Sequence, residues 1–218
     1  MSLSEPRGEA ARRRFPGVRA PRPLLSLEGE ARLTPRQREL LDALEALVVR
    51  GGFAELTMAQ IAARVNCSLR TLYGISPSKD ELVLTVVDRR LHRIGRAAIE
   101  SLDASMSPLE AVRAYLQAAN EAVQPATGAF LRDFAGFPGA KRLADTHAAY
   151  VIGVTKSLLD RAVAEGEIPP LDTAAVAHVL GGLAAEFGRA EVSAAIAKPP
   201  KETADAITEI VLRGLRSS

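Results

Sequence analysis

The chain has 218 residues, of which 47% are hydrophobic and 25% charged, the profile of a globular protein of one or two domains. Aromatic residues make up only 4%, tryptophan is absent, and alanine and leucine dominate, so the composition favours helices over sheets. No apolar run approaches the roughly 20 residues that cross a bilayer, and the N-terminal arginines are not followed by the apolar core of a secretory signal. One cysteine and three scattered histidines exclude an internal disulfide and argue against a structural metal site. We therefore expect a cytoplasmic, all-α protein with no metal, no cofactor and no membrane partner.

The net charge of +2 is unevenly distributed. Residues 1–22 carry six arginines against two glutamates, a balance of +4, whereas residues 93–218 carry 13 basic and 15 acidic groups, a balance of −2. Residues 1–30 also contain four prolines and almost no periodic apolar pattern, which predicts a flexible basic arm. This arm is either an inert tail or a contact for DNA phosphates.

The periodic helical pattern begins after this arm. Thr34-Pro35-Arg36-Gln37 forms a capping box, and leucines follow at helical spacing until Gly51-Gly52 ends the helix. Including the short helices described next, the pattern predicts nine helices and no strand. The six helices that follow residue 77 span residues 78–102, 107–123, 130–134, 140–165, 172–190 and 203–215. Their ends are marked by Ser, Thr or Asp caps or by Pro and Gly residues.

Two short helices separated by a sharp turn occupy residues 57–73. Thr57-Met58-Ala59-Gln60 is a second capping box, Asn66 stands where a tight turn needs a left-handed residue, and Ser68 caps the second short helix. This arrangement predicts a helix-turn-helix motif, whose second helix lies in the DNA major groove.

Several side chains in and around this motif are candidates for DNA contact. Arg70 can donate two hydrogen bonds to guanine, and Leu69 or the methyl group of Thr71 can pack on a thymine methyl group. Tyr73 and Lys79 are suited to phosphates, which fix the register without reading sequence. The alternatives are that Arg70 is only solvated and that Tyr73 is half core. Cys67, in the turn, is expected to be a small buried residue and not a redox switch. The predicted DNA-binding residues are Thr57, Ser68, Leu69, Arg70, Thr71, Tyr73 and Lys79.

Residues 34–91 resemble the DNA-binding domain of the TetR family of bacterial transcriptional regulators. One departure stands out: the family usually follows the tyrosine with x-His-Phe, whereas Gly74-Ile75-Ser76 follows Tyr73 here. Ile75 can supply the packing of that segment but not the phosphate contact of the histidine. The resemblance is carried by Leu44, Gly52-Phe53, Leu56-Thr57-Met58, Ile61-Ala62, Val65-Asn66-Cys67-Ser68, Thr71-Leu72-Tyr73 and Pro77-Ser78-Lys79-Asp80-Glu81-Leu82.

The resemblance implies a three-helix DNA-binding domain at residues 31–91, after the arm at 1–30, and a larger helical domain for effector binding and dimerisation at 92–218. In that domain the last two helices are expected to form a four-helix bundle with a second subunit, with Gly181-Gly182 permitting close approach. The alternative is that both helix faces are buried within one subunit. The predicted interface residues are Val179, Leu183, Phe187, Ile207 and Val211.

The effector pocket is expected among the middle helices. Phe130, Phe134 and Phe137 recur at core spacing as well as pocket spacing, and His147 fits a core histidine as well as a ligand partner. Few charged residues lie on these faces, which favours an apolar effector. The candidate pocket residues are Tyr115, Phe130, Phe134, Phe137, His147 and Tyr150.

The sequence thus predicts a sequence-specific DNA-binding regulator, specifically a homodimeric repressor that leaves a palindromic double-stranded operator when a small, largely apolar effector binds. The alternative is a helical protein-interaction or architectural protein with weakened DNA binding. No glycine-rich phosphate loop, nucleophile elbow, paired carboxylate motif or metal spacing is present, so we do not expect an enzyme.

Overall fold

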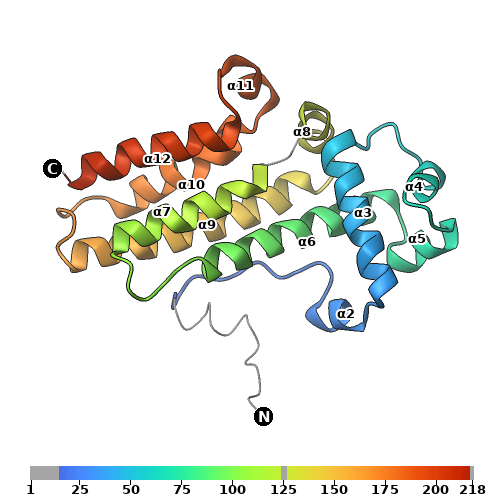
Figure 1. The fold of residues 1–218 in the computed structure, drawn as a ribbon, viewed down its shortest axis with the longest axis horizontal. Helices are drawn as coiled ribbons and strands as arrows, with labels where there is room; N and C mark the ends of the chain where they lie inside the picture. Colours follow the sequence, from blue (N-terminus) through green and yellow to red (C-terminus); the bar gives the residue numbers. More distant parts are fainter. Residues whose placement is uncertain (1–14, 124–126, 217–218) are drawn as a thin grey trace, which may run out of the picture. The chain divides into compact units, whose positions relative to one another are not determined.

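The computed structural model describes residues 15–123 and 127–216, and the regular secondary structure of these residues is helical throughout (Figure 1). None of the described helices combines the length and the apolar character needed to span a bilayer. The helices are α2 (Leu27–Arg32), α3 (Pro35–Gly51), α4 (Met58–Arg64), α5 (Leu69–Ile75), α6 (Lys79–Glu100), α7 (Pro108–Ala119), the 3-10 helix η1 (Asn120–Val123), α8 (Gly128–Ala135), α9 (Ala140–Ala164), α10 (Thr173–Phe187), α11 (Ala190–Ala195) and α12 (Pro200–Arg216).

Five of the helix starts predicted from capping residues are confirmed. Thr34, Thr57 and Ser107 each form a complete capping box, in which the hydroxyl accepts from the third helical N–H and the Gln or Glu side chain there accepts from the cap. Ser68 and Asp172 cap α5 and α10 through their side chains. These helix boundaries are therefore set by local hydrogen bonds.

Some helix ends and two short helices were not predicted. α10 ends at Phe187 and not near residue 190, and α12 begins at Pro200, before the predicted Thr203. The nine predicted helices become eleven α-helices in the described residues, because α2 and α11 were missed. Each of these has six residues, too few for an apolar period to be visible in the sequence.

The chain divides into two compact units. The helix-turn-helix unit contains residues 22–93 together with 127–145, and the C-terminal unit contains 15–21, 94–123 and 146–216. The sequence predicted a division into residues 31–91 and 92–218. The structure differs in that α8 and the start of α9 belong with the helix-turn-helix unit.

The core of the helix-turn-helix unit consists of two clusters. One joins α3 to the helix-turn-helix through buried residues that include Leu44, Ile61, Leu72 and Leu82. The other is aromatic. Its members are Val48, Val49, Phe53, Val83, Val87 and Phe130, with Phe134 and Phe137 packed against them.

The core of the C-terminal unit lies between α7, α9, α10 and α12, and α12 runs beside both α7 and α10 (Figure 1). Its buried residues include Tyr115, Leu158, Leu180 and Leu212. At the edge of this core the Glu167 carboxylate accepts hydrogen bonds from the Leu109 N–H and the Ser107 hydroxyl.

The first described residues are more ordered than the predicted arm. Residues 1–14, which include Arg7, Arg12, Arg13 and Arg14 of that arm, lie outside the described residues. In the rest of it, Phe15 is only 2% exposed within the core of the C-terminal unit. The Leu24 N–H donates to the Asp88 carboxylate at 2.8 Å, within the helix-turn-helix unit. The expectation of a flexible arm is therefore wrong for residues 15–30, where short-range turn and helix signals outweigh the lack of a long apolar period.

Candidate functional site

The two helices of the predicted motif pack through one apolar face. Ile61, Ala62, Val65 and Leu72 are buried, and Leu72 is completely inaccessible. Between the helices Asn66 has a φ of 52°, the left-handed conformation expected for it. This turn lets α5 pack against α4 and leaves the opposite face of α5 open to solvent.

The open face of α5 carries the residues predicted to read DNA. Leu69 and Tyr73 are 40% and 51% exposed, and both belong to the small group of large apolar side chains that the described residues leave exposed. Ser68, Arg70 and Thr71 are also exposed. An apolar and hydrogen-bonding surface on a short protruding helix is suited to the edges of bases in a major groove.

Two hydroxyl groups of this region are already engaged in capping. The Ser68 hydroxyl accepts from the Thr71 N–H at 3.0 Å and lies 2.8 Å from the Thr71 hydroxyl. The Thr57 hydroxyl accepts from the Gln60 N–H and lies 3.0 Å from its amide oxygen. The positioning role of these groups is thus visible in the structure, while DNA contact by them stays a prediction.

Lys79 holds the loop that precedes α4. Its ammonium donates to the carbonyl oxygens of Ala54, at 2.8 Å, and Phe53, at 3.4 Å. The sequence predicted a phosphate contact for this lysine, and an ammonium group has a third N–H that remains for one.

The same loop is held from its other side by Asp133 of α8. The Asp133 carboxylate accepts from the N–H groups of Phe53 and Ala54, at 2.6 and 2.8 Å. Gly52 has a φ of 75°, and a Cβ there would lie 2.7 Å from the Asp133 carboxylate, so this position requires glycine. Sequence reasoning missed Asp133, because nothing in the sequence pairs an aspartate with backbone some 80 residues earlier.

The segment that departs from the family pattern is packed. Ile75 packs against the cluster that contains Leu72, as expected, and Ser76 is buried at the end of α5 with its N–H donating to the Leu72 carbonyl. The replacement of x-His-Phe by Gly74-Ile75-Ser76 therefore leaves the anchoring of α5 intact.

The turn residue Cys67 is half-buried. Burial raises the pKa of its thiol, an effect that the positive charge of Arg36 partly offsets. Arg36 also donates to the Asn66 carbonyl at 3.3 Å, so it fastens the turn to α3. A thiol with a raised pKa is a weak nucleophile, which agrees with a structural role for Cys67.

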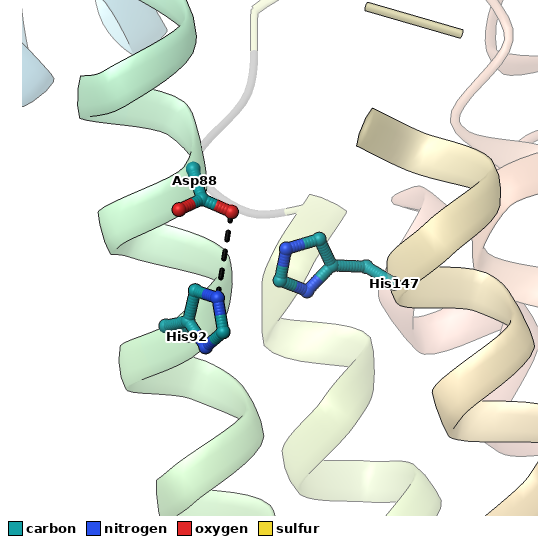
Figure 2. A group of neighbouring side chains, drawn as sticks. All are labelled: Asp88, His92 and His147. Carbon is teal, nitrogen blue, oxygen red and sulfur yellow. Dashed lines mark ion pairs between the residues drawn. The ribbon is translucent and has the colours of Figure 1, made fainter. Parts of the chain in front are cut away.

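Charged groups fasten α6 to the rest of the helix-turn-helix unit. Arg90 and Arg93 both pair with Glu45 of α3, at 3.1 and 2.6 Å. On the same helix, the Asp88 carboxylate lies 3.5 Å from the His92 imidazole (Figure 2). α6 therefore holds the base of α3 through hydrogen-bonded charges as well as apolar contacts.

The predicted pocket residues fall into two groups. Phe130, Phe134 and Phe137 lie in the aromatic cluster of the helix-turn-helix unit, where the rings of Phe53 and Phe137 meet edge-on at 5.0 Å. Tyr115 and Tyr150 belong to the core of the C-terminal unit, and His147 lies partly exposed on α9. The six candidates thus belong to two different units, and ligand contact by any of them stays a prediction.

The predicted interface residues lie on α10 and α12. Val179 is 57% exposed, Leu183 and Val211 are half-buried against the core, and Phe187 and Ile207 are partly exposed. The chain also exposes 65% of Ile210, between two of these positions on α12. Gly181 allows close approach within the subunit, because a Cβ there would lie 2.9 Å from Ile152 of α9.

The architecture, an outward-facing helix-turn-helix in one unit and a helical second unit, defines a helix-turn-helix transcriptional regulator. The family model described as bacterial regulatory proteins, tetR family, matches residues 40–86. The HTH-type transcriptional repressor KstR of Rhodococcus jostii is 30% identical over 151 residues, which is 66% of this chain and 67% of that protein. The chain belongs to the TetR family.

Other similarities agree with this assignment. KstR of Mycobacterium tuberculosis is 29% identical over 152 residues, 66% of each chain, so the match spans about two thirds of these relatives. A TetR transcription regulator from Haloarcula marismortui has a TM-score of 0.68 at 16% identity, over 82% of this chain and 96% of that one. The TetR family regulator PfmR from Thermus thermophilus has a TM-score of 0.59 at 20% identity, over 81% and 98%. These two structures share the fold.

Proposed function

We propose that the chain is a homodimeric repressor that binds a palindromic operator through α5. The observation that carries this proposal is the contrast along α5, where Leu72 is fully buried while Leu69, Arg70 and Tyr73 face solvent. Leu69 and Tyr73 expose apolar area that no described residue covers, and Arg70 adds a bidentate donor for guanine. The relatives named as repressors support the direction of regulation.

The dimer is assembled through α10 and α12. Val179 and Ile210 are large apolar side chains on these neighbouring helices, and each exposes more than half of its surface. Exposed apolar side chains that gather on one face of a globular protein indicate a partner surface. A two-fold dimer places two recognition helices on successive major grooves, roughly 34–36 Å apart, which requires a palindromic operator.

A small, largely apolar effector releases the operator. α6 contributes residues to both units, so a change in the C-terminal unit that shifts α6 also shifts the helix-turn-helix that packs on it. An effector can move this equilibrium only through its different affinities for the two states.

Selection from a randomised DNA pool, at one fixed near-physiological salt concentration, tests the proposal. Enrichment of a palindrome by the full chain is the expected result and supplies the operator. Weak, salt-sensitive binding with no enriched sequence would overturn it and favour the protein-interaction alternative, with the loss of the x-His-Phe phosphate contact as the cause.

A further inference from the structure

A tight turn at the start of the described chain is docked in the core of the C-terminal unit. Phe15-Pro16-Gly17-Val18 has the pattern of a type II turn, with proline second and glycine third, a φ of 96° at Gly17 and a Val18 N–H donating to the Phe15 carbonyl at 3.2 Å. Pro16 and Gly17 are exposed, whereas Phe15 is buried and Val18 is partly buried. The turn thus inserts two apolar side chains while its tip stays in solvent.

The seat of this turn is shaped to receive it. Gly153 lies inside α9, where glycine weakens a helix relative to alanine. A Cβ at this position would lie 3.0 Å from the Val18 side chain, so Gly153 provides the space that the turn occupies. A side chain at Gly153 would press against the turn.

The core that receives Phe15 also contains an unsatisfied hydroxyl group. Tyr115 is completely buried in the same cluster, and its hydroxyl has no hydrogen-bond partner among the described residues. Burial raises the pKa of Tyr115, and the neighbouring Tyr150 raises it further, so the hydroxyl stays protonated and able to donate. A buried hydroxyl without a hydrogen-bond partner destabilises the fold, and a ligand that accepts a hydrogen bond from it removes that cost.

We propose that Phe15 and Val18 fill the effector site of the C-terminal unit as an internal stopper, and that the effector competes with them. The effector is a molecule with an apolar body that replaces the two side chains. It also has an acceptor group, which accepts a hydrogen bond from the Tyr115 hydroxyl. This inference rests on the proposed function, because it assigns the site and the chemistry of the effector. Displacing the turn also acts on the segment that leads to Leu24, which is bonded to Asp88 of α6.

Binding of the dye anilinonaphthalene sulfonate, which has an apolar body and an acceptor group, tests this directly on the full chain without DNA. Phe15→Ala should bind one equivalent of dye about tenfold more tightly than the unchanged chain, since an internal competitor lowers apparent affinity by the fraction of open molecules. Adding Tyr115→Phe to Phe15→Ala should weaken that binding about fivefold through the lost hydrogen bond.

The matched control is Leu158→Ala, which removes a buried side chain of the same cluster without touching the turn. Equal dye affinity in Phe15→Ala and Leu158→Ala would mean that any void binds the dye, and unchanged affinity in Phe15→Ala would mean that Phe15 is only a core residue. Either result overturns the proposal.

If Phe15→Ala fails to fold, the variant Gly153→Ala tests the proposal instead, because it disturbs the turn without truncating the core. It should also tighten dye binding, and no change would count against the stopper. Operator binding is measured separately, so a failed stopper leaves the repressor proposal standing.

Discussion

The Asp133 carboxylate accepts a hydrogen bond from the Phe53 N–H at 2.6 Å, and this bond ties α8 to the loop between α3 and α4. The same carboxylate also accepts from Ala54, and Lys79 holds the two carbonyl oxygens of that loop. The loop that leads into α4 is therefore fixed from both sides by side chains far from it in the sequence.

Replacing Asp133 should destabilise the helix-turn-helix unit. Asp133→Ala leaves the partly buried Phe53 N–H without its carboxylate acceptor, which costs about 1–3 kcal/mol, whereas the exposed Ala54 N–H can bond to water. Urea unfolding measures the change in the free energy of unfolding. Asp145→Ala is the control, because this exposed aspartate pairs with Lys141 one helical turn away and should cost less than about 0.5 kcal/mol. Equal costs for the two variants would contradict the assignment.

Glu45 should matter far more than an exposed glutamate of the same helix. The side chains of Glu45 and Arg90 are only 10% and 11% exposed, so Glu45→Ala removes the carboxylate from a largely desolvated guanidinium and should cost about 3 kcal/mol. Glu39, which pairs with Arg36, is 66% exposed, and Glu39→Ala should cost less than about 1 kcal/mol. Thermal unfolding of both variants checks the difference, and similar losses would mean that water solvates the Glu45 pair well.

The stabilisation that Glu167 gives the C-terminal unit should be lost in acid. Burial alone would raise the pKa of this carboxyl, but hydrogen bonds from the Leu109 N–H, Ser107 and Arg216 outweigh burial and lower it. Its stabilising contribution is then present above the unfolded-state pKa of about 4.3 and is lost as the pH falls through the lower folded-state value. Urea midpoints from pH 7 down to pH 3 should show the gap between the unchanged chain and Glu167→Gln closing as the pH falls. A gap that stays constant would show that the charge of Glu167 does not contribute.

Arg70 should contribute to operator affinity without affecting the fold. Arg70→Ala should weaken binding to the selected operator by about 10-fold to 100-fold, the equivalent of about 1–3 kcal/mol for a bidentate base contact. Fluorescence anisotropy at fixed salt measures this. Arg161→Ala, which removes an exposed arginine of the C-terminal unit, has the same change in charge and should bind as the unchanged chain does. An equal loss of operator affinity in Arg70→Ala and Arg161→Ala would mean that Arg70 contributes only through the overall charge of the protein.

The dimer surface should be sensitive to a single charge. Ile210→Glu places a carboxylate on the exposed apolar face of α12, and burying it in an interface would cost several kcal/mol, so the variant should sediment as a monomer. Leu24→Glu is the matched control, because Leu24 is comparably exposed but lies in the helix-turn-helix unit. A dimer that persists in Ile210→Glu would place the interface elsewhere.

The sequence by itself determined the helix-turn-helix and those helix starts that a capping side chain marks, such as those of α3, α4 and α7. Capping boxes such as those at Thr34 and Thr57 depend on residues three positions apart, and the left-handed turn depends on Asn66 alone. Because these interactions are local, one sequence contains all that is needed to find them. The outward face of α5 follows from the same local pattern, since burial of Leu72 fixes which residues face solvent.

Only the tertiary structure decided which distant segments meet. The apolar spacing of Phe130, Phe134 and Phe137 fits a pocket as well as a core, and contact with Phe53 places these rings in the aromatic cluster. The Phe15 turn and the Asp133 carboxylate likewise depend on partners about 80 residues away or more. The physical reason is that periodicity states which face of a helix is buried but not what buries it, because that choice is made by packing among all the helices at once.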